Sequence, residues 1–461
     1  MDADGKPIPH KRVAAVNPDA GEKVIPNPNS GLIWDFTKRS ENFEDAMYRS
    51  ISNVTIHDNL VIAACAAGFV HCLDAKTGEK YWTHEMWGGI WGSPLIVDGL
   101  VYVGDEDGDV EILRLSSHPD VAMKKVDGEY QPIAKIYMGG SVYSSPIFAN
   151  NALYIATRNS LHAIETKQTP QDVSETRAGG NWPQWRGPQR TNVSTETDLL
   201  KQWPAGGPPL LWQAEGLGEG VSSVSIAGGR IYTLGYRDGN EYAIALDEKN
   251  GTKIWDARIG PAVKEAGIMR WLNQRTPTVD SDRLYVVTTS GELICLETAG
   301  GVEIWRKSYT VDFEGNKARY GYCDFPLIDG EKLICTPGGP TATMVALNKR
   351  TGEVIWKSAV PGENRTAYST TVVAEVGGIR QYLNYLYHGL VGVAATDGRF
   401  LWRYDANADR FGNVYTPIVR GDLVFSPVSF GARPHGSALL KLLPVGNGIK
   451  VEEQYLGYFY V

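Results

Sequence analysis

The chain repeats one short motif, in which a glycine stands four residues before a tryptophan. The motif occurs five times, at Gly78/Trp82, Gly251/Trp255, Gly301/Trp305, Gly352/Trp356 and Gly398/Trp402. The last four tryptophans are spaced 50, 51 and 46 residues apart. A period of this length indicates an array of similar units, each built from one supersecondary element.

Each motif predicts a strand, a tight turn and a second strand. In residues 245–255 an apolar run leads into Asp247, and Gly251 follows where the turn needs a positive φ. A second signature, two apolar strands joined by a two-residue turn, occurs at 93–103, 145–155, 223–232, 276–286 and 416–425. Together the two signatures give four antiparallel strands, which make one blade of a β-propeller.

Eight such units are predicted. They lie near residues 51–83, 92–114, 143–166, 222–256, 276–306, 325–357, 366–403 and 415–443. The sequence therefore predicts an all-β fold, an eight-bladed β-propeller of four-stranded antiparallel blades.

The composition supports this fold and excludes several classes of function. The 461 residues include 51 Gly, 13 Trp and 23 Tyr, a mixture typical of many short strands joined by tight turns. A net charge of −8 argues against nucleic-acid binding, which needs a dense basic surface. No apolar run is long enough to predict a transmembrane helix, and the first residues show no signal peptide. The five cysteines include no CxxC pair, and their odd number argues against a complete disulfide framework.

Residues 73–82, Leu-Asp-Ala-Lys-Thr-Gly-Glu-Lys-Tyr-Trp, resemble the tryptophan-docking motif of pyrroloquinoline-quinone-like (PQQ-like) β-propellers. The resemblance extends over about residues 13–443. In that family the tryptophan of one blade packs against the turn of its neighbour. The resemblance therefore implies a structural docking role for Trp82, Trp255, Trp305, Trp356, Trp402, Gly78, Gly251, Gly301, Gly352 and Gly398.

Two kinds of protein share this motif: quinoprotein dehydrogenases, and the outer-membrane assembly factor BamB with its non-enzymatic relatives. Residues 181–188, Asn-Trp-Pro-Gln-Trp-Arg-Gly-Pro, followed by Leu211-Trp212, are similar to the start of the BamB-like branch. In such proteins this segment lies near the mature N-terminus, whereas here it follows several blade-like units.

The position of that segment leaves two domain organisations open. Residues 1–166 form an N-terminal blade array, 167–205 a linker and 206–461 a C-terminal blade array. The two arrays either close together as one propeller, which we favour because closure removes exposed sheet edges, or belong to two incomplete propellers. Residues 13–21 and 31–34 resemble the second half of a blade without its first half, which fits either organisation.

The resemblance implies which residues an enzyme of this family would need. Quinoprotein alcohol and sugar dehydrogenases carry an adjacent Cys-Cys pair, a Ca²⁺ site of Glu, Asn and Asp, and a catalytic Asp. This chain has no adjacent cysteines and no recognisable set of these ligands. We therefore expect no catalytic residue, no metal and no cofactor. A quinoprotein dehydrogenase using PQQ and Ca²⁺ is the alternative, and a carbohydrate-binding module is a third.

Other motifs give no chemistry of their own. Residues 105–109, Asp-Glu-Asp-Gly-Asp, lack the Glu that completes a calcium loop and are interpreted as a solvated turn. His71 and His162 occupy matching strand positions, and no histidine pair has zinc-ligand spacing.

Propellers bind partners through loops and the central channel. Candidate ligand- or partner-binding residues are Arg275, Arg365, Trp271, Tyr368, Asn384 and His388, since Trp, Tyr and Arg are enriched at interface hot spots. The resemblance implies a bacterial, extracytoplasmic scaffold of the periplasm or cell envelope. Its partners would be other proteins or a small ligand, not nucleic acid. Any association with a membrane would be indirect, by binding to those partners.

Overall fold

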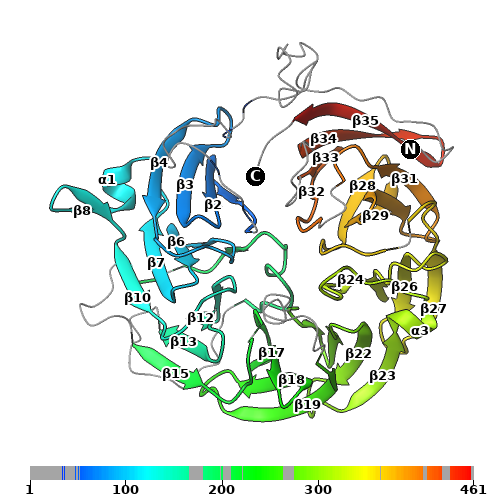
Figure 1. Ribbon diagram of the computed structural model, residues 1–461, viewed down its shortest axis with the longest axis horizontal. Helices are drawn as coiled ribbons and strands as arrows, with labels where there is room; N and C mark the ends of the chain where they lie inside the picture. Colours follow the sequence, from blue (N-terminus) through cyan, green and yellow to red (C-terminus); the bar gives the residue numbers. More distant parts are fainter. Residues whose placement is uncertain are drawn as a thin grey trace. The chain divides into compact units, whose positions relative to one another are not determined.

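The computed structural model describes most of the chain. The described residues are Trp34, Phe36, Met47, Ser50, 52–165, 180–197, 199–200, 209–220, 222–262, 275–363, 365–408, 413–427 and 437–457. They form eight sheets of four or five strands and one separate hairpin. In Figure 1 most of these sheets fall within a short stretch of the colour scale, because their strands are close in sequence, whereas two sheets take one strand from further along the chain.

The first four sheets are as follows: β1 (Thr55–His57), β2 (Leu60–Ala64), β3 (Phe69–Asp74) and β4 (Lys80–Glu85); β5 (Leu95–Val97), β6 (Leu100–Gly104), β7 (Asp109–Arg114) and β10 (Ala134–Tyr137), with β14 (Val193–Ser194) parallel to β5; β11 (Ile147–Ala149), β12 (Ala152–Ala156), β13 (Leu161–Glu165) and β15 (Leu210–Ala214); β16 (Ser225–Ala227), β17 (Arg230–Arg237), β18 (Asn240–Asp247) and β19 (Lys253–Pro261).

The last four sheets are β20 (Thr278–Asp280), β21 (Arg283–Val287), β22 (Glu292–Glu297) and β23 (Glu303–Ser308); β24 (Leu327–Asp329), β25 (Lys332–Cys335), β26 (Met344–Asn348) and β27 (Val354–Ser358); β28 (Val372–Val376), β29 (Ile379–Leu386), β30 (Gly389–Ala394) and β31 (Phe400–Tyr404); β32 (Ile418–Arg420), β33 (Leu423–Ser426), β34 (Ser437–Val445) and β35 (Gly448–Gly457). The hairpin is β8 (Lys124–Val126) with β9 (Glu129–Gln131), and α1 (Pro119–Ala122) and α3 (Tyr309–Asp312) are single helical turns. The predicted all-β fold of successive four-stranded blades is confirmed, with one sheet at each predicted unit.

The described residues fall into two compact units. The N-terminal unit comprises those from Met47 to Val286 with Cys295–Glu303. The C-terminal unit comprises Trp34, Phe36, Val287–Ile294 and those from Ile304 to Gly457. In each unit, apolar strand residues of adjacent sheets build the core: Leu95, Phe148 and Ile244 share one cluster in the N-terminal unit.

The third sheet takes its fourth strand from far along the chain. Strand β13 pairs with β15, so His162 lies directly opposite Gln213. The segment predicted as a linker separates these two strands in the sequence. The predicted boundaries at 166 and 206 therefore run through one sheet. Trp212, which the resemblance placed at the start of the BamB-like segment, lies on that fourth strand.

The turn of the repeated motif is fixed by hydrogen bonds within a few residues. Asp247 Oδ1 accepts the N–H groups of Lys249 (2.9 Å) and Asn250 (3.2 Å), and its carbonyl oxygen accepts the N–H of Gly251 (2.9 Å). Asp74 and Asn348 make the same side-chain contacts in their own turns. The five motif glycines have φ between 69° and 73°, a conformation that residues with a Cβ rarely adopt. Hydrogen bonds within the turn therefore explain why an Asp or Asn stands four residues before the glycine in these three motifs.

Each of four tryptophans packs on the motif glycine of the following sheet. A Cβ on that glycine would lie 2.4–2.8 Å from the indole ring, in the pairs Trp212/Gly251, Trp255/Gly301, Trp305/Gly352 and Trp356/Gly398. Each indole Nε1 also donates to a carbonyl three residues before the glycine, as Trp255 does to Thr298 (3.0 Å). Two tryptophans differ: Trp82 donates to Ser116 (2.8 Å), and Trp402 donates to Gln381 of its own sheet (2.8 Å).

The charge on Asp74 predicts an acid-sensitive turn. Hydrogen bonds, first from the Thr77 N–H and then from the Tyr81 hydroxyl, lower the pKa of Asp74 to about 2. Because this pKa lies below the ordinary value of 3.8, the stabilisation is complete above about pH 3.8 and is lost as the pH falls through about 2. In the Asp74→Asn variant, an amide faces the Asn59 and Tyr81 donors. We expect lower urea midpoints than wild type at pH 7, with the gap closing towards pH 2. A gap that stays constant over this range would contradict the prediction.

Candidate protein-binding site

Three of the predicted binding residues gather on loops of the C-terminal unit. Arg365 and Tyr368 lie in the segment before β28, and His388 lies in the turn between β29 and β30. The term loop cluster denotes six side chains of this region, Arg319, Tyr320, Arg365, Tyr368, Tyr387 and His388, all of them exposed or half-buried. They come from three connections that are distant in sequence, so the fold and not the local sequence brings them together.

Arg365 is held over an aromatic ring. Its guanidinium carbon lies 5.0 Å from the centre of the Tyr387 ring, and its Nε donates to the carbonyl of Lys317 (3.0 Å). A cation over a tyrosine face gains about 0.5–1 kcal/mol at an exposed site. Arg365 is therefore oriented in advance, which lowers the entropy cost of using it in binding.

A second pair of rings lies on the neighbouring connection. The ring centres of Tyr320 and Tyr368 are 6.1 Å apart, and the Tyr320 N–H donates to the Tyr368 hydroxyl (3.0 Å). Burial raises the pKa of Tyr368 to about 12, so this hydroxyl stays protonated at neutral pH. Arg319 lies over Tyr320, with its guanidinium carbon 5.6 Å from the ring centre. The half-buried rings thus support an exposed cation.

His388 is fixed by a buried carboxylate. Glu363, whose side chain is inaccessible to solvent, accepts from the His388 backbone N–H and lies 2.9 Å from its Nδ1. The imidazole meets the Tyr387 ring edge-on, with the ring centres 4.8 Å apart. Sequence reasoning selected His388 and missed Glu363 and Tyr387. The adjacency of Tyr387 to His388 in a turn was the only signal available.

Asn384 lies in the core. Its side chain is buried, and its Nδ2 donates to Thr336 Oγ1 (2.9 Å) and Thr371 Oγ1 (3.1 Å). It lines a cavity of about 10 Å³ together with Asp324 and Ser369. This volume is far too small for an organic ligand. The role predicted for Asn384 in binding is untested, and the contacts are those of a structural residue.

The two remaining candidates lie elsewhere. Arg275 belongs to the N-terminal unit, where it is 2% exposed and forms an ion pair with the equally buried Glu241 (2.5 Å). A guanidinium in this position is already paired in the interior. Trp271 lies outside the described residues.

A quinone–Ca²⁺ site would need several donor side chains grouped together. In the part of the chain that the structure describes, no three His, Cys, Asp or Glu side chains are grouped so as to bind a metal ion. The five cysteines are free thiols, and none is adjacent to another in sequence. The expected absence of PQQ and Ca²⁺ stays a prediction, since the oxygen ligands of Ca²⁺ also include amide side chains. Also within the described residues, no helix has the length and apolar character needed to cross a membrane.

Comparison with protein families gives a match over most of the chain. Residues 9–168 and 239–429 match the PQQ_2 family model, which is described as "Outer membrane protein assembly factor BamB".

Similar curated proteins carry the same description. The BamB protein of Kangiella koreensis is 25% identical over 215 residues, covering 46% of this chain and 49% of that protein. That of Salmonella typhimurium is 25% identical over 277 residues, covering 54% and 64%. The chain thus spans less than two thirds of these relatives.

Solved structures show the same fold. BamB from Moraxella catarrhalis has a TM-score of 0.51 and 14% identity, covering 83% of this chain and 95% of that one. A quinohemoprotein alcohol dehydrogenase from Pseudomonas putida has a TM-score of 0.51 and 11% identity, covering 91% and 72%. At these identities the likeness concerns the β-propeller fold alone.

Proposed function

The chain belongs to the PQQ_2 family of BamB-type β-propellers, and from this premise we propose that it is a non-catalytic scaffold that binds other proteins. The loop cluster is the proposed binding surface. The setting proposed from the named relatives is the bacterial cell envelope, outside the cytoplasm. The motif tryptophans are proposed to lock adjacent blades together, so that the loops are presented on a rigid support.

The observation that supports this function is the composition and order of the loop cluster. Arg and Tyr are enriched among the hot-spot residues of protein interfaces, and here they are exposed or half-buried and held by internal contacts. Two arginines, Arg319 and Arg365, stand beside aromatic rings, while the nearby Glu363 carboxylate is buried against His388. The surface therefore suits a partner segment that offers carboxylates and flat apolar groups.

Site-specific photo-crosslinking tests the proposed surface. A benzophenone amino acid at position 320 is expected to give adducts with a protein of the outer-membrane assembly machinery in intact cells. Adding Arg319→Ala or Arg365→Ala should reduce the adduct yield about tenfold, because each removes an interface arginine. Arg350→Ala is the matched control, since Arg350 is also exposed in the C-terminal unit and lies outside the loop cluster. Equal loss with all three arginine variants, or no adduct at position 320, would contradict the proposed surface.

A direct assay distinguishes the proposed scaffold from the alternative, a quinoprotein dehydrogenase. PQQ and Ca²⁺ are added to the purified full chain, and quinone absorbance and dye-linked alcohol oxidation are followed. The proposed scaffold neither binds the quinone stoichiometrically nor turns over alcohol. Turnover would overturn the non-catalytic proposal.

A further inference from the structure

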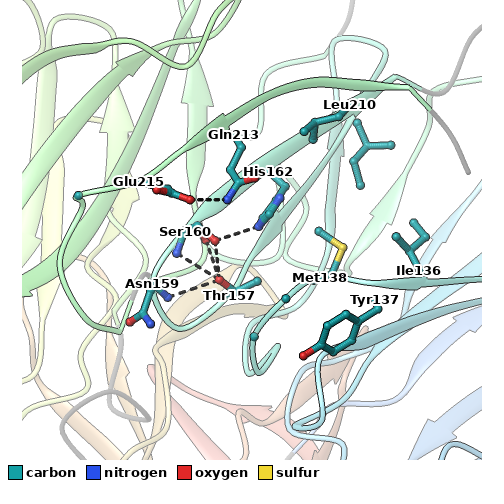
Figure 2. A pocket seen from close by; sticks show the side chains of 14 residues that line it. Ile136, Tyr137, Met138, Thr157, Asn159, Ser160, His162, Leu210, Gln213 and Glu215 are labelled. Carbon is teal, nitrogen blue, oxygen red and sulfur yellow. Dashed lines mark hydrogen bonds between the residues drawn. The ribbon is translucent and has the colours of Figure 1, made fainter.

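An open cavity of about 760 Å³ lies in the N-terminal unit, away from the loop cluster. It is lined by the end of β10 and the following loop on one side, and by β13, β15 and their turns on the other. Figure 2 shows polar side chains of the third sheet facing apolar side chains of the second across this space. The volume is within the range of sites that bind small organic molecules.

The polar wall is an ordered chain of uncharged hydrogen-bonding groups. Ser160 Oγ lies 2.9 Å from His162 Nε2 and 2.8 Å from Thr157 Oγ1. Burial lowers the pKa of His162, an effect that Glu215 partly offsets, so the imidazole is neutral at pH 7. Hydroxyls and a neutral imidazole each donate and accept hydrogen bonds. This wall is thus suited to a ligand that also carries groups of both kinds.

Planar polar side chains extend this wall to the mouth of the cavity. Gln213 and Asn159 are exposed, and Gln213 Nε2 donates to Glu215 Oε1 (2.8 Å). Gln213 is the cross-strand partner of His162, so both point to the same face of the sheet. The exposed amides and carboxylate can form paired hydrogen bonds with neighbouring hydroxyls.

The opposite wall is apolar and ends in an exposed ring. Tyr137 is 69% exposed at the cavity mouth, beside Ile136 and the buried Met138. Leu210, 53% exposed, and the buried Ile164 continue the apolar surface on the third sheet. An exposed aromatic ring of this kind offers a flat face for the C–H groups of a saturated ring, together with a polar tip.

The charge of the lining narrows the class of ligand further. Among the described lining residues Glu215 is the sole acidic side chain, and no Lys or Arg is present. An anionic ligand would meet a carboxylate without a compensating cation. A neutral ligand with many hydroxyls and one apolar face meets both walls. We propose that this cavity binds a neutral oligosaccharide, with Tyr137 stacking on a sugar ring and Gln213, Asn159, Ser160 and Glu215 binding its hydroxyls.

Titration calorimetry and saturation-transfer NMR on the full chain test this proposal. The probes are maltotriose, cellotriose and N,N′,N″-triacetylchitotriose, with trigalacturonic acid as the anionic comparison. At least one neutral trisaccharide is expected to saturate a single site. Tyr137→Ala should weaken its binding about fivefold to tenfold, and Gln213→Ala about fivefold. Both side chains are exposed, so the variants should fold normally.

Control variants and comparison ligands distinguish sugar binding in this cavity from nonspecific binding elsewhere on the chain. Trp87→Ala removes another highly exposed aromatic side chain of the same unit, one that does not line the cavity, and should leave Kd unchanged. Trigalacturonic acid should bind more weakly than the neutral sugars, and Glu215→Gln should narrow the difference. Capped trialanine is added as a peptide probe of similar size. Failure of all three sugars to saturate, an unchanged Kd in Tyr137→Ala, or tighter binding of this peptide than of the sugars would overturn the proposal. Arg319→Ala should not affect sugar binding, so this result is independent of the protein-binding test.

Discussion

Replacing Gly398 with alanine is expected to destabilise the C-terminal unit by about 3 kcal/mol. Two costs add. Gly398 has φ = 72°, where a residue with a Cβ is strained by about 1–2 kcal/mol. The new Cβ would also lie 2.4 Å from the Trp356 ring, which must shift although its Nε1 is bonded to the Ala395 carbonyl.

A matched glycine separates the two costs. Gly421 has φ = 61° in the same unit, and a Cβ there meets no atom within 4 Å. Gly421→Ala should therefore cost only the backbone strain, about 1 kcal/mol. Equilibrium urea unfolding of the full chain, followed by tryptophan fluorescence, measures both variants. If the two glycines cost the same, the packing of Trp356 on Gly398 contributes nothing and the proposed locking role of the motif tryptophans is wrong.

Removing one partner of the Arg275–Glu241 pair is the other change with a large expected effect. Both side chains are 2% exposed, and Arg275 Nη2 lies 2.5 Å from Glu241 Oε2. Arg275→Met removes the cation that pairs with the buried Glu241 carboxylate, and Glu241→Leu removes the carboxylate that pairs with the buried guanidinium. Each single variant should lose about 3–5 kcal/mol, because a charge in the interior is costly once its counter-ion is removed.

The double variant Arg275→Met/Glu241→Leu provides the decisive comparison. It removes both charges of the pair together and should be more stable than either single variant. Urea unfolding of the wild type and the three variants completes the cycle. Additive losses in the double variant would show that the two side chains act independently. The same unfolding data are needed to test the predicted ligand role of Arg275. A loss of binding in an Arg275 variant supports that role only where the variant is still folded.

The residues of the candidate sites could be predicted only in part from the sequence. Arg365, Tyr368 and His388 were selected because they are interface-type residues in predicted loops, and they do lie in one loop group. Their supports, Glu363 and Tyr387, were missed because neither residue carries a local signal. The cavity beside His162 was not predicted either, since its lining combines the end of β10 and the loop after it with β13, β15 and the residues beside them. Arg275 was expected near a ligand, and only its neighbours in space reveal the buried Glu241.

The sequence by itself determined the blade unit and the number of blades. Both depend on contacts within about ten residues: the Asp247 carboxylate on the next N–H groups, the positive φ of Gly251 and the alternation of apolar residues along each strand. Only the tertiary structure decided which tryptophan meets which glycine. Trp212 has no glycine four residues before it and still packs on Gly251, whereas Trp402 has one and bonds to Gln381. Such pairings, like β13 with β15, join residues distant in the chain, and contacts of that kind leave no periodic pattern in the sequence.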